Sequence, residues 1–218
     1  MSADPLRPHL RVVAADGRAD ERSDEALMAA YRLGDGRAFE VLVLRHRRPV
    51  FGFLLRMGLR AAPAEEVLAD VFLKVHRAAS TYEPTARFTT WLYTVARRAA
   101  LNALNKHGAR REVPLGGAAE AEAAGPLRST AGSGDDPESL LAARRSVALV
   151  DHELRSLPEG HRDAFILYYA QGLDCGEVAA VLAVSSAEVK GRLAYARKLL
   201  RTRLAGRVPE ASSSETTS

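Results

Sequence analysis

The sequence predicts an all-α protein in which two small helical domains are joined by a flexible acidic linker. Apolar residues recur with the period of a helix through two segments, residues 23–111 and 138–206. No segment shows the alternation of apolar and polar residues that predicts a strand. Residues 112–137 are rich in Gly, Ala, Ser and carboxylates, a composition that buries no core. The polar ends, residues 1–22 and 207–218, are expected to form a flexible arm and a disordered tail.

Turn-forming residues divide the first domain into helices. The sequence Gly-Asp-Gly at 34–36 marks a turn, and Asp35 is a candidate cap for the next helix. A second break ends at Pro63, which suits the first position of a helix. Glu65 and Glu66 then fall in the first turn, where carboxylates meet the positive end of the helix.

The outer face of this helix is acidic. Glu66 and Asp70 are four residues apart and therefore lie together, opposite a stripe of apolar residues. Two interpretations remain open for this face, which either is solvated or meets a protein partner with a basic surface.

The last helix of the first domain follows a loop at residues 80–87 and ends near Gly108. Residues 88–111 contain no acidic residue. Aromatic rings beside cations and amides suit single-stranded nucleic acid, because bases stack on rings and phosphates meet arginine. The candidate contacts divide between two neighbouring faces, with Thr94, Arg98 and Asn102 on one and Thr90, Tyr93 and Arg97 on the next. Trp91 has the spacing of a core residue and is expected to pack inside.

The second domain contains the pattern of a helix-turn-helix. Asp174 and Glu177 have the spacing of a capping box and open a short helix that ends near Leu182. After a three-residue connector, Ser185 and Glu188 form a second candidate box. A short helix, a tight turn and a longer helix form the arrangement that places a recognition helix in the major groove of DNA.

The longer helix, residues 185–204, carries six cations and one carboxylate. These cations are suited to neutralising phosphates, and residues near the helix start are suited to reaching base edges. The competing interpretation is a terminal amphipathic helix kept soluble by Arg and Lys, in which Glu188 is only a cap.

Composition limits the classes of function. The 218 residues have a formal net charge of +4 and a pI near 9.4. Cys175 is the only cysteine, so no internal disulfide forms and a reducing cytoplasm is expected. No apolar run has the length of a membrane-spanning helix, and the N-terminal residues lack the apolar core of a signal peptide. We therefore expect a cytoplasmic protein without membrane insertion.

Four stretches together resemble the extracytoplasmic-function group of the bacterial sigma-70 family. The resemblance covers about residues 24–111 and 139–205. In the first domain it rests on AEEVLADVFLKVHRA (64–78) and FTTWLYTVARRAALNALNK (88–106). In the second domain it rests on LPEGHR (157–162) followed by EVAAVLAVSSAEVKGRLAYAR (177–197).

The resemblance implies a promoter-specificity subunit that binds core RNA polymerase and promoter DNA, and that an anti-sigma factor usually holds inactive. It implies polymerase binding by Glu66, Asp70 and Leu73. It places the melted −10 element against Tyr82, Arg87, Thr90, Tyr93, Thr94, Arg97, Arg98, Asn102 and Lys106. It places the duplex −35 element against Lys190, Gly191, Arg192, Ala194, Tyr195, Arg197 and Lys198.

Two other classes of function compete with this interpretation. An ordinary helix-turn-helix activator or repressor would bind duplex DNA alone, usually as a symmetric dimer, and has no use for a second, acid-free aromatic helix. An enzyme needs chemistry that the sequence lacks, since it contains no Glu-x-x-His, His-x-x-Glu or phosphate-loop motif. Cys175 has no matched histidine. We therefore predict no catalysis, no cofactor, no metal and no small-molecule substrate.

Overall fold

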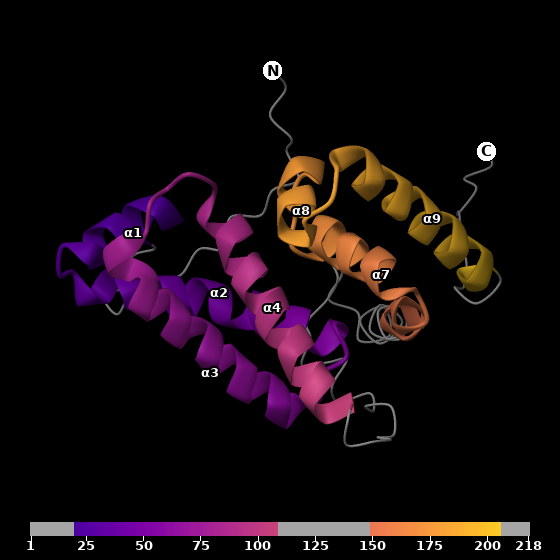
Figure 1. The fold of residues 1–218 in the computed structure, drawn as a ribbon, viewed down its shortest axis with the longest axis horizontal. Helices are drawn as coiled ribbons and strands as arrows, with labels where there is room; N and C mark the ends of the chain where they lie inside the picture. The colour runs from indigo at the N-terminus through magenta and orange to yellow at the C-terminus, as the bar shows by residue number, and fades with distance from the viewer. Residues whose placement is uncertain (1–19, 109–148, 206–218) are drawn as a thin grey trace, which may run out of the picture.

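The structure is a computed structural model that describes residues 20–108 and 149–205, and all regular elements in these two ranges are helical. The N-terminal module, residues 20–108, contains α1 (Asp24–Arg32), α2 (Gly36–Arg56), α3 (Ala61–Ala78), η1 (Ala79–Thr81) and α4 (Phe88–Gly108). The C-terminal module, residues 149–205, contains a helical segment at 149–155, then α7 (Glu159–Phe165), η2 (Ile166–Ala170), α8 (Cys175–Leu182) and α9 (Ser186–Leu204). The predicted all-α fold is confirmed (Figure 1).

Several expectations fall on residues for which no description is given. The structure describes none of residues 1–19 of the predicted arm, the predicted linker at 112–137, residues 138–148 of the second predicted domain, or the predicted tail. Among the described helices, none is long and apolar enough to cross a membrane.

Local capping explains where the first helices begin. The Ser23 hydroxyl accepts a hydrogen bond from the amide of Ala26 at the start of α1. Asp35 does the same for Ala38 at the start of α2, as the sequence predicts. The start of α3 differs from the prediction, because the helix begins at Ala61 and Pro63 is its third residue. The first four amides of a helix lack partners within it, so proline is tolerated at any of these positions. Consequently no carboxylate lies in the first turn of α3.

The N-terminal module is a bundle in which α4 packs against α3 and α2. Its largest fully buried side chains include Leu42, Phe53, Phe88 and Leu92. Trp91 is half-buried and packs against this core, with ring centroids 5.8 Å from Phe88. The expectation that Trp91 is a packing residue therefore agrees with its surroundings.

The C-terminal module contains the predicted helix-turn-helix in α8 and α9. The capping box of α8 is complete, because Asp174 accepts from the amide of Glu177 and Glu177 accepts from the amide of Asp174. The second predicted box is only half formed. Ser185 accepts from the amide of Glu188, but the Glu188 carboxylate binds Arg192 instead of closing the box.

The two modules pack on each other, a point that the sequence leaves open. Helix α4 lies against α8 (Figure 1). Helix α2 lies against η2. Buried apolar residues of both modules form one continuous cluster, in which Phe53 and Leu92 of one module join Ile166 and Val178 of the other. The described parts of the chain therefore share a core.

Candidate nucleic-acid and polymerase interfaces

The outer face of α3 combines carboxylates with an exposed leucine. Glu66, Asp70 and Leu73 are all exposed, and their spacing of four and three residues puts them on one side of the helix. Leu73 is one of the few large apolar residues exposed in the described ranges, at 43%. An apolar side chain beside unpaired acids is typical of a surface that meets another protein.

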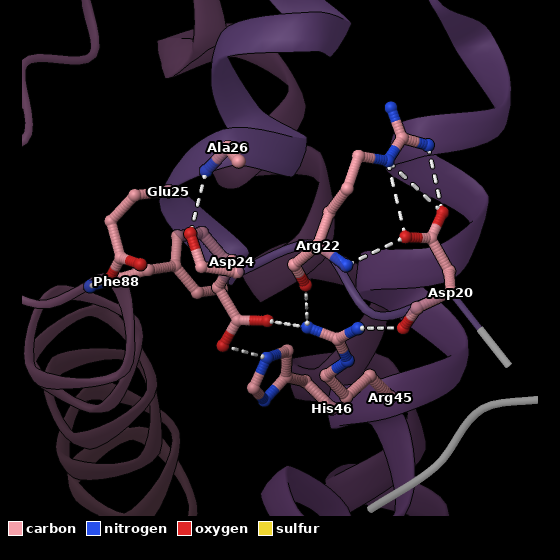
Figure 2. Close-up of polar contacts among 9 residues, drawn as sticks. Asp20, Arg22, Asp24, Glu25, Ala26, Arg45, His46 and Phe88 are labelled. Carbon is pink, nitrogen blue, oxygen red and sulfur yellow. Dashed lines mark hydrogen bonds and ion pairs between the residues drawn. The ribbon is translucent and has the colours of Figure 1, made fainter.

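The start of α4 is fixed by a residue from α1. Glu25 Oε1 accepts a hydrogen bond from the backbone amide of Phe88, with N and O 2.8 Å apart (Figure 2). The first turn of α4 contains no acid, and the side chain of Arg87 before it has only donors. Glu25 therefore supplies both the missing cap and the negative charge that a helix N-terminus favours.

Sequence reasoning missed Glu25. The available signal was the helix start itself, since a helix that begins after an arginine needs an acceptor from elsewhere in the fold.

A carboxylate next to Glu25 ties α1 to α2. Asp24 Oδ1 lies 2.5 Å from Nη1 of Arg45, and Asp24 Oδ2 lies 2.8 Å from Nε2 of His46 (Figure 2). Burial pushes the pKa of Asp24 upward, but the hydrogen bonds and charges of His46 and Arg45 outweigh it, and the pKa lies below its ordinary value. The His46 ring also packs on Phe88, with centroids 5.4 Å apart. Asp24 and Glu25 together hold α1, α2 and the start of α4 in one arrangement.

One row of the predicted −10 residues faces solvent. Arg98, Asn102 and Lys106 are exposed and follow one another at intervals of four residues on α4. Thr94 begins the row, is half-buried and donates its hydroxyl to the carbonyl of Thr90 at 2.8 Å. This row is available to a nucleic acid strand in the arrangement described.

The neighbouring row of α4 faces the C-terminal module instead. Thr90 and Tyr93 are buried, and Arg97 has a side-chain exposure of 19%. Each donates a hydrogen bond to the C-terminal module. The Thr90 hydroxyl donates to Glu177 Oε1 at 3.5 Å, the Tyr93 hydroxyl donates to Gln171 Oε1, and Arg97 Nε donates to Asp163 Oδ2 at 2.9 Å. Helix α4 therefore has the two faces that helical spacing predicts. The face with Arg98 and Asn102 is exposed to solvent, and the face with Thr90, Tyr93 and Arg97 packs on the C-terminal module.

The loop before α4 contains two of the predicted −10 residues, of which one is exposed and the other is half-buried. Arg87 is exposed and lies 3.2 Å from Glu177. Tyr82 is half-buried, and its ring packs against Trp91 with centroids 5.5 Å apart. Burial, with the nearby carboxylates of Glu25 and Asp24, raises the pKa of the Tyr82 hydroxyl, which has no hydrogen-bond partner among the described residues.

A third ion pair joins the two modules, this time from α2. Arg56 Nε donates to Asp151 Oδ1 at 3.0 Å, and both side chains are almost fully buried. Burial raises the pKa of Asp151, and Arg56 offsets this only in part. The same holds for Asp163, where burial raises the pKa against the opposing effect of Arg97.

Helix α9 presents most of the predicted −35 residues to solvent. The exposed members are Lys190, Gly191, Ala194, Tyr195, Arg197 and Lys198. A Cβ atom added to Gly191 would meet no atom within 4 Å, so packing within the chain does not require glycine there. Absence of a side chain at this position leaves the helix backbone open to close approach by a partner.

Arg192 is the exception among these residues. Its guanidinium lies back on α7, where Nη1 donates to the carbonyl of Gly160 at 3.4 Å, and it pairs with Glu188 at 2.5 Å. A Cβ atom on Gly160 would lie only 2.6 Å from Nη1 of Arg192, so the glycine makes room for it. Arg192 is thus held by the protein in the arrangement described.

Two protein families match the chain. The family described as sigma-70 region 2 matches residues 42–110, and the family described as sigma-70 region 4 matches residues 148–200. The RNA polymerase sigma-H factor of Pseudomonas aeruginosa is 29% identical over 183 residues, or 83% of this chain and 93% of its own. The ECF RNA polymerase sigma-E factor of Escherichia coli K12 is 29% identical over 185 residues, or 84% and 94%.

Two solved structures share the fold. CnrH, in complex with the cytosolic domain of CnrY, has a TM-score of 0.61 at 24% identity and covers 84% of this chain and 98% of its own. The sigma factor RpoE, in complex with the anti-sigma factor NepR from Bartonella quintana, has a TM-score of 0.57 at 20% identity and covers 78% and 98%. At these identities the likeness establishes the fold.

A chain that is helical throughout its described elements and carries sigma-70 region 2 and then region 4, the latter with a basic helix-turn-helix, is a sigma-70 type of initiation factor. Factors of this type bind core RNA polymerase and direct promoter recognition, without catalysis of their own. The chain belongs to the extracytoplasmic-function group of the sigma-70 family. The family predicted from the sequence is therefore confirmed.

Proposed function

We propose that this sigma factor divides its work among three surfaces. The outer face of α3 binds core RNA polymerase, α4 with the loop before it binds the melted −10 strand, and α9 reads the duplex −35 element. The functional domains are residues 23–111 and 138–206. The observation that carries this division is the contrast in charge, since the exposed acids of α3 (Glu65, Glu66 and Asp70) precede its exposed cations, whereas α4 exposes cations alone and α9 mostly cations.

The chemistry of α3 favours a protein partner. Glu66 and Asp70 would repel the phosphates of a nucleic acid, and this mixed face, which continues with Lys74 and Arg77, suits a protein surface better than DNA. An exposed Leu73 beside them adds apolar area that a protein surface would cover. These residues are the proposed contacts with polymerase.

The chemistry of α9 favours the major groove of duplex DNA. Lys190, Arg197 and Lys198 are exposed cations suited to phosphates. Gly191 and Ala194 have little or no side chain, so the helix backbone can come close to DNA there. Tyr195 adds an exposed aromatic ring close to them. We expect these residues to set the position and the sequence preference at the −35 element.

The solvent-facing row of α4 supports the −10 assignment. Arg98, Asn102 and Lys106, with Arg87 in the loop, offer cations and an amide to an unpaired strand. Thr90, Tyr93 and Arg97 face the C-terminal module, so they reach DNA only if the modules separate.

Size-exclusion chromatography with bacterial core RNA polymerase at moderate salt tests the proposal. The wild-type chain should co-elute, and Glu66→Ala with Asp70→Ala should weaken the complex while duplex DNA binding is unchanged. Glu21→Ala with Glu40→Ala is the matched control, because it removes two exposed carboxylates outside α3.

Each failure in that experiment has a distinct meaning. A double α3 variant that co-elutes like wild type would disprove the polymerase face. A wild-type chain that binds duplex DNA but never polymerase would favour the ordinary helix-turn-helix regulator.

We also propose that an anti-sigma factor regulates the chain and that the chain acts in the cytoplasm. The support for regulation is that the structural neighbour RpoE was solved bound to the anti-sigma factor NepR. The support for a cytoplasmic location comes from the proposed partners, because core polymerase and promoter DNA are both found in the cytoplasm.

A further inference from the structure

The loop before α4 is held at both ends by one group of aromatic rings. Tyr82 begins the loop at residues 82–87 and Phe88 follows it, and their ring centroids lie 6.3 Å apart. Trp91 packs on both rings, and Phe88 is fully buried. The position of Phe88 therefore determines how the loop and the first turn of α4 lie.

Helix α1 contacts the chain on both sides of this loop. It packs against η1 before the loop and against α4 after it. Glu25 provides a polar contact with α4, because its Oε1 accepts a hydrogen bond from the backbone amide of Phe88 at 2.8 Å (Figure 2). The Phe88 amide is among the first four N–H groups of the helix, which have no acceptor within it. The bond from Glu25 therefore fixes the place where the helix begins.

The Glu25 side chain starts from a backbone that is itself held in place. Arg45 of α2 donates to the carbonyls of Asp20 and Arg22, at 3.0 and 3.1 Å, and to the carboxylate of Asp24 (Figure 2). These bonds hold the start of α1 on α2. All the residues involved belong to the N-terminal module, so the arrangement does not depend on where the C-terminal module lies.

We propose that Glu25 is a positioning residue for −10 recognition. The reach of its side chain, and not its charge, sets where the loop enters α4 and so places Tyr82 and Arg87 against the melted strand. This inference rests on the proposed function of α4 and adds to it a residue of α1 that acts without touching DNA.

The charge of Glu25 has two opposing effects. It favours the positive end of α4, but it repels the phosphates of a strand bound beside it. The acceptor oxygen has one effect, which is to hold the Phe88 amide. The glutamine of a capping box shows that a neutral oxygen suffices for such a bond. The reach of the side chain is therefore the property that strand binding requires.

Two substitutions separate reach from charge. Glu25→Asp keeps the charge but shortens the side chain by one methylene, or about 1.5 Å, so the carboxylate no longer reaches the Phe88 amide. Glu25→Gln keeps the length and an acceptor oxygen and removes the charge. Glu40→Asp is the matched control, because it shortens an exposed carboxylate of α2 in the same module.

Hydrogen exchange in the free chain, followed by nuclear magnetic resonance, tests the bond. A helix cap is worth about a fivefold change in an opening equilibrium, so the Phe88 amide should exchange about fivefold faster in Glu25→Asp than in wild type. Glu25→Gln and Glu40→Asp should exchange nearly like wild type. Trp91 is the only tryptophan of the chain, so its emission should change in Glu25→Asp alone as the rings around Phe88 move.

Strand binding is measured on the complex with core RNA polymerase. The probe is a labelled single-stranded DNA that the wild-type complex selects from a random pool, after sequences that bind core polymerase alone have been removed. Glu25→Asp should bind the probe about two- to fivefold more weakly, because affinity falls with the fraction of molecules whose binding surface is formed. Glu25→Gln should bind it at least as well as Glu40→Asp. Both Glu25 variants should co-elute with core polymerase and bind non-promoter duplex DNA like wild type, which a generally destabilised chain would not.

Three results would overturn the positioning role. One is unchanged exchange of the Phe88 amide in Glu25→Asp. Another is faster exchange with unchanged strand binding, which would make the cap purely structural. The third is loss of strand binding in Glu25→Gln but not in Glu25→Asp, because charge would then be the property that matters. If Glu25→Asp does not co-elute with polymerase, Glu25→Met replaces it, since methionine has a stem of similar length and no oxygen.

Variants of α4 distinguish this failure from failure of the proposed function. Arg98→Ala with Asn102→Ala removes two exposed residues of the proposed −10 surface. If this pair weakens strand binding and Glu25→Asp does not, only the positioning role is wrong. If neither weakens it, or if the wild-type complex selects no strand, the proposed function of α4 fails, while exchange of the Phe88 amide still shows whether Glu25 fixes the start of the helix.

Discussion

The salt dependence of DNA binding should separate the free cations of α9 from those already paired within the chain. Lys190 and Lys198 are exposed and form no ion pair with a carboxylate in residues 20–108 or 149–205. Arg203, on the same helix, lies 3.6 Å from Glu153 and also binds the Ser156 hydroxyl. A lysine that neutralises a phosphate releases a counterion, whereas a paired arginine first has to leave its carboxylate.

The size of the change in salt dependence follows from the number of phosphate contacts that are lost. Each phosphate contact contributes about 0.9 to the slope of log K against log salt, so Lys190→Ala with Lys198→Ala should reduce the slope by roughly 1.8. From about 50 to about 200 mM salt, each lost contact makes the fall in affinity about 3.5-fold smaller. Arg203→Ala should change the slope by much less.

Fluorescence anisotropy with a labelled duplex that contains no promoter makes the comparison, because phosphate contacts are independent of sequence. The reasoning fails if Arg203→Ala flattens the salt dependence as much as one lysine substitution does. It also fails if the double lysine variant keeps the wild-type slope, since exposure would then not predict phosphate contact.

Three stability predictions follow from the helix termini and the ion pairs. Asp24→Asn should destabilise the chain at neutral pH. The pKa of Asp24 is lowered from an ordinary 3.8, so its contribution is complete above that pH and is lost as pH falls through the lowered value, and melting curves of wild type and variant should converge there. Ala183→Gly should raise stability by about 0.5–1 kcal/mol in thermal unfolding, because Ala183 is exposed and has φ of 56°; a lower melting temperature would contradict this. Asp174→Ala should cost about 1 kcal/mol by removing the cap of α8, and unchanged urea unfolding would count against that role.

Local chemistry made the helix starts predictable from the sequence. Asp35 and the pair Asp174 and Glu177 act on amides two or three residues away, so their spacing alone identifies them. The predicted start of α3 was wrong, because proline fits several positions of a first turn and the helix begins at Ala61 instead of Pro63.

Contacts between distant residues left no such signal. The faces of α4 followed from helical spacing, but spacing does not say what covers a face. Arg97 meets Asp163 from 66 residues away, and Phe88 takes its cap from Glu25, 63 residues earlier. Both contacts depend on how helices pack, which the order of the amino acids does not display locally.

The cap supplied by Glu25 has a practical consequence for where this protein can be cut. The region 2 match begins at residue 42, after α1 has ended. A fragment trimmed to that match would keep every predicted −10 residue and would still lose the carboxylate that holds the first amide of α4, together with the Asp24 bonds to Arg45 and His46. The smallest piece that carries a properly anchored −10 helix therefore begins before Ser23, and sequence similarity alone would set its boundary too late.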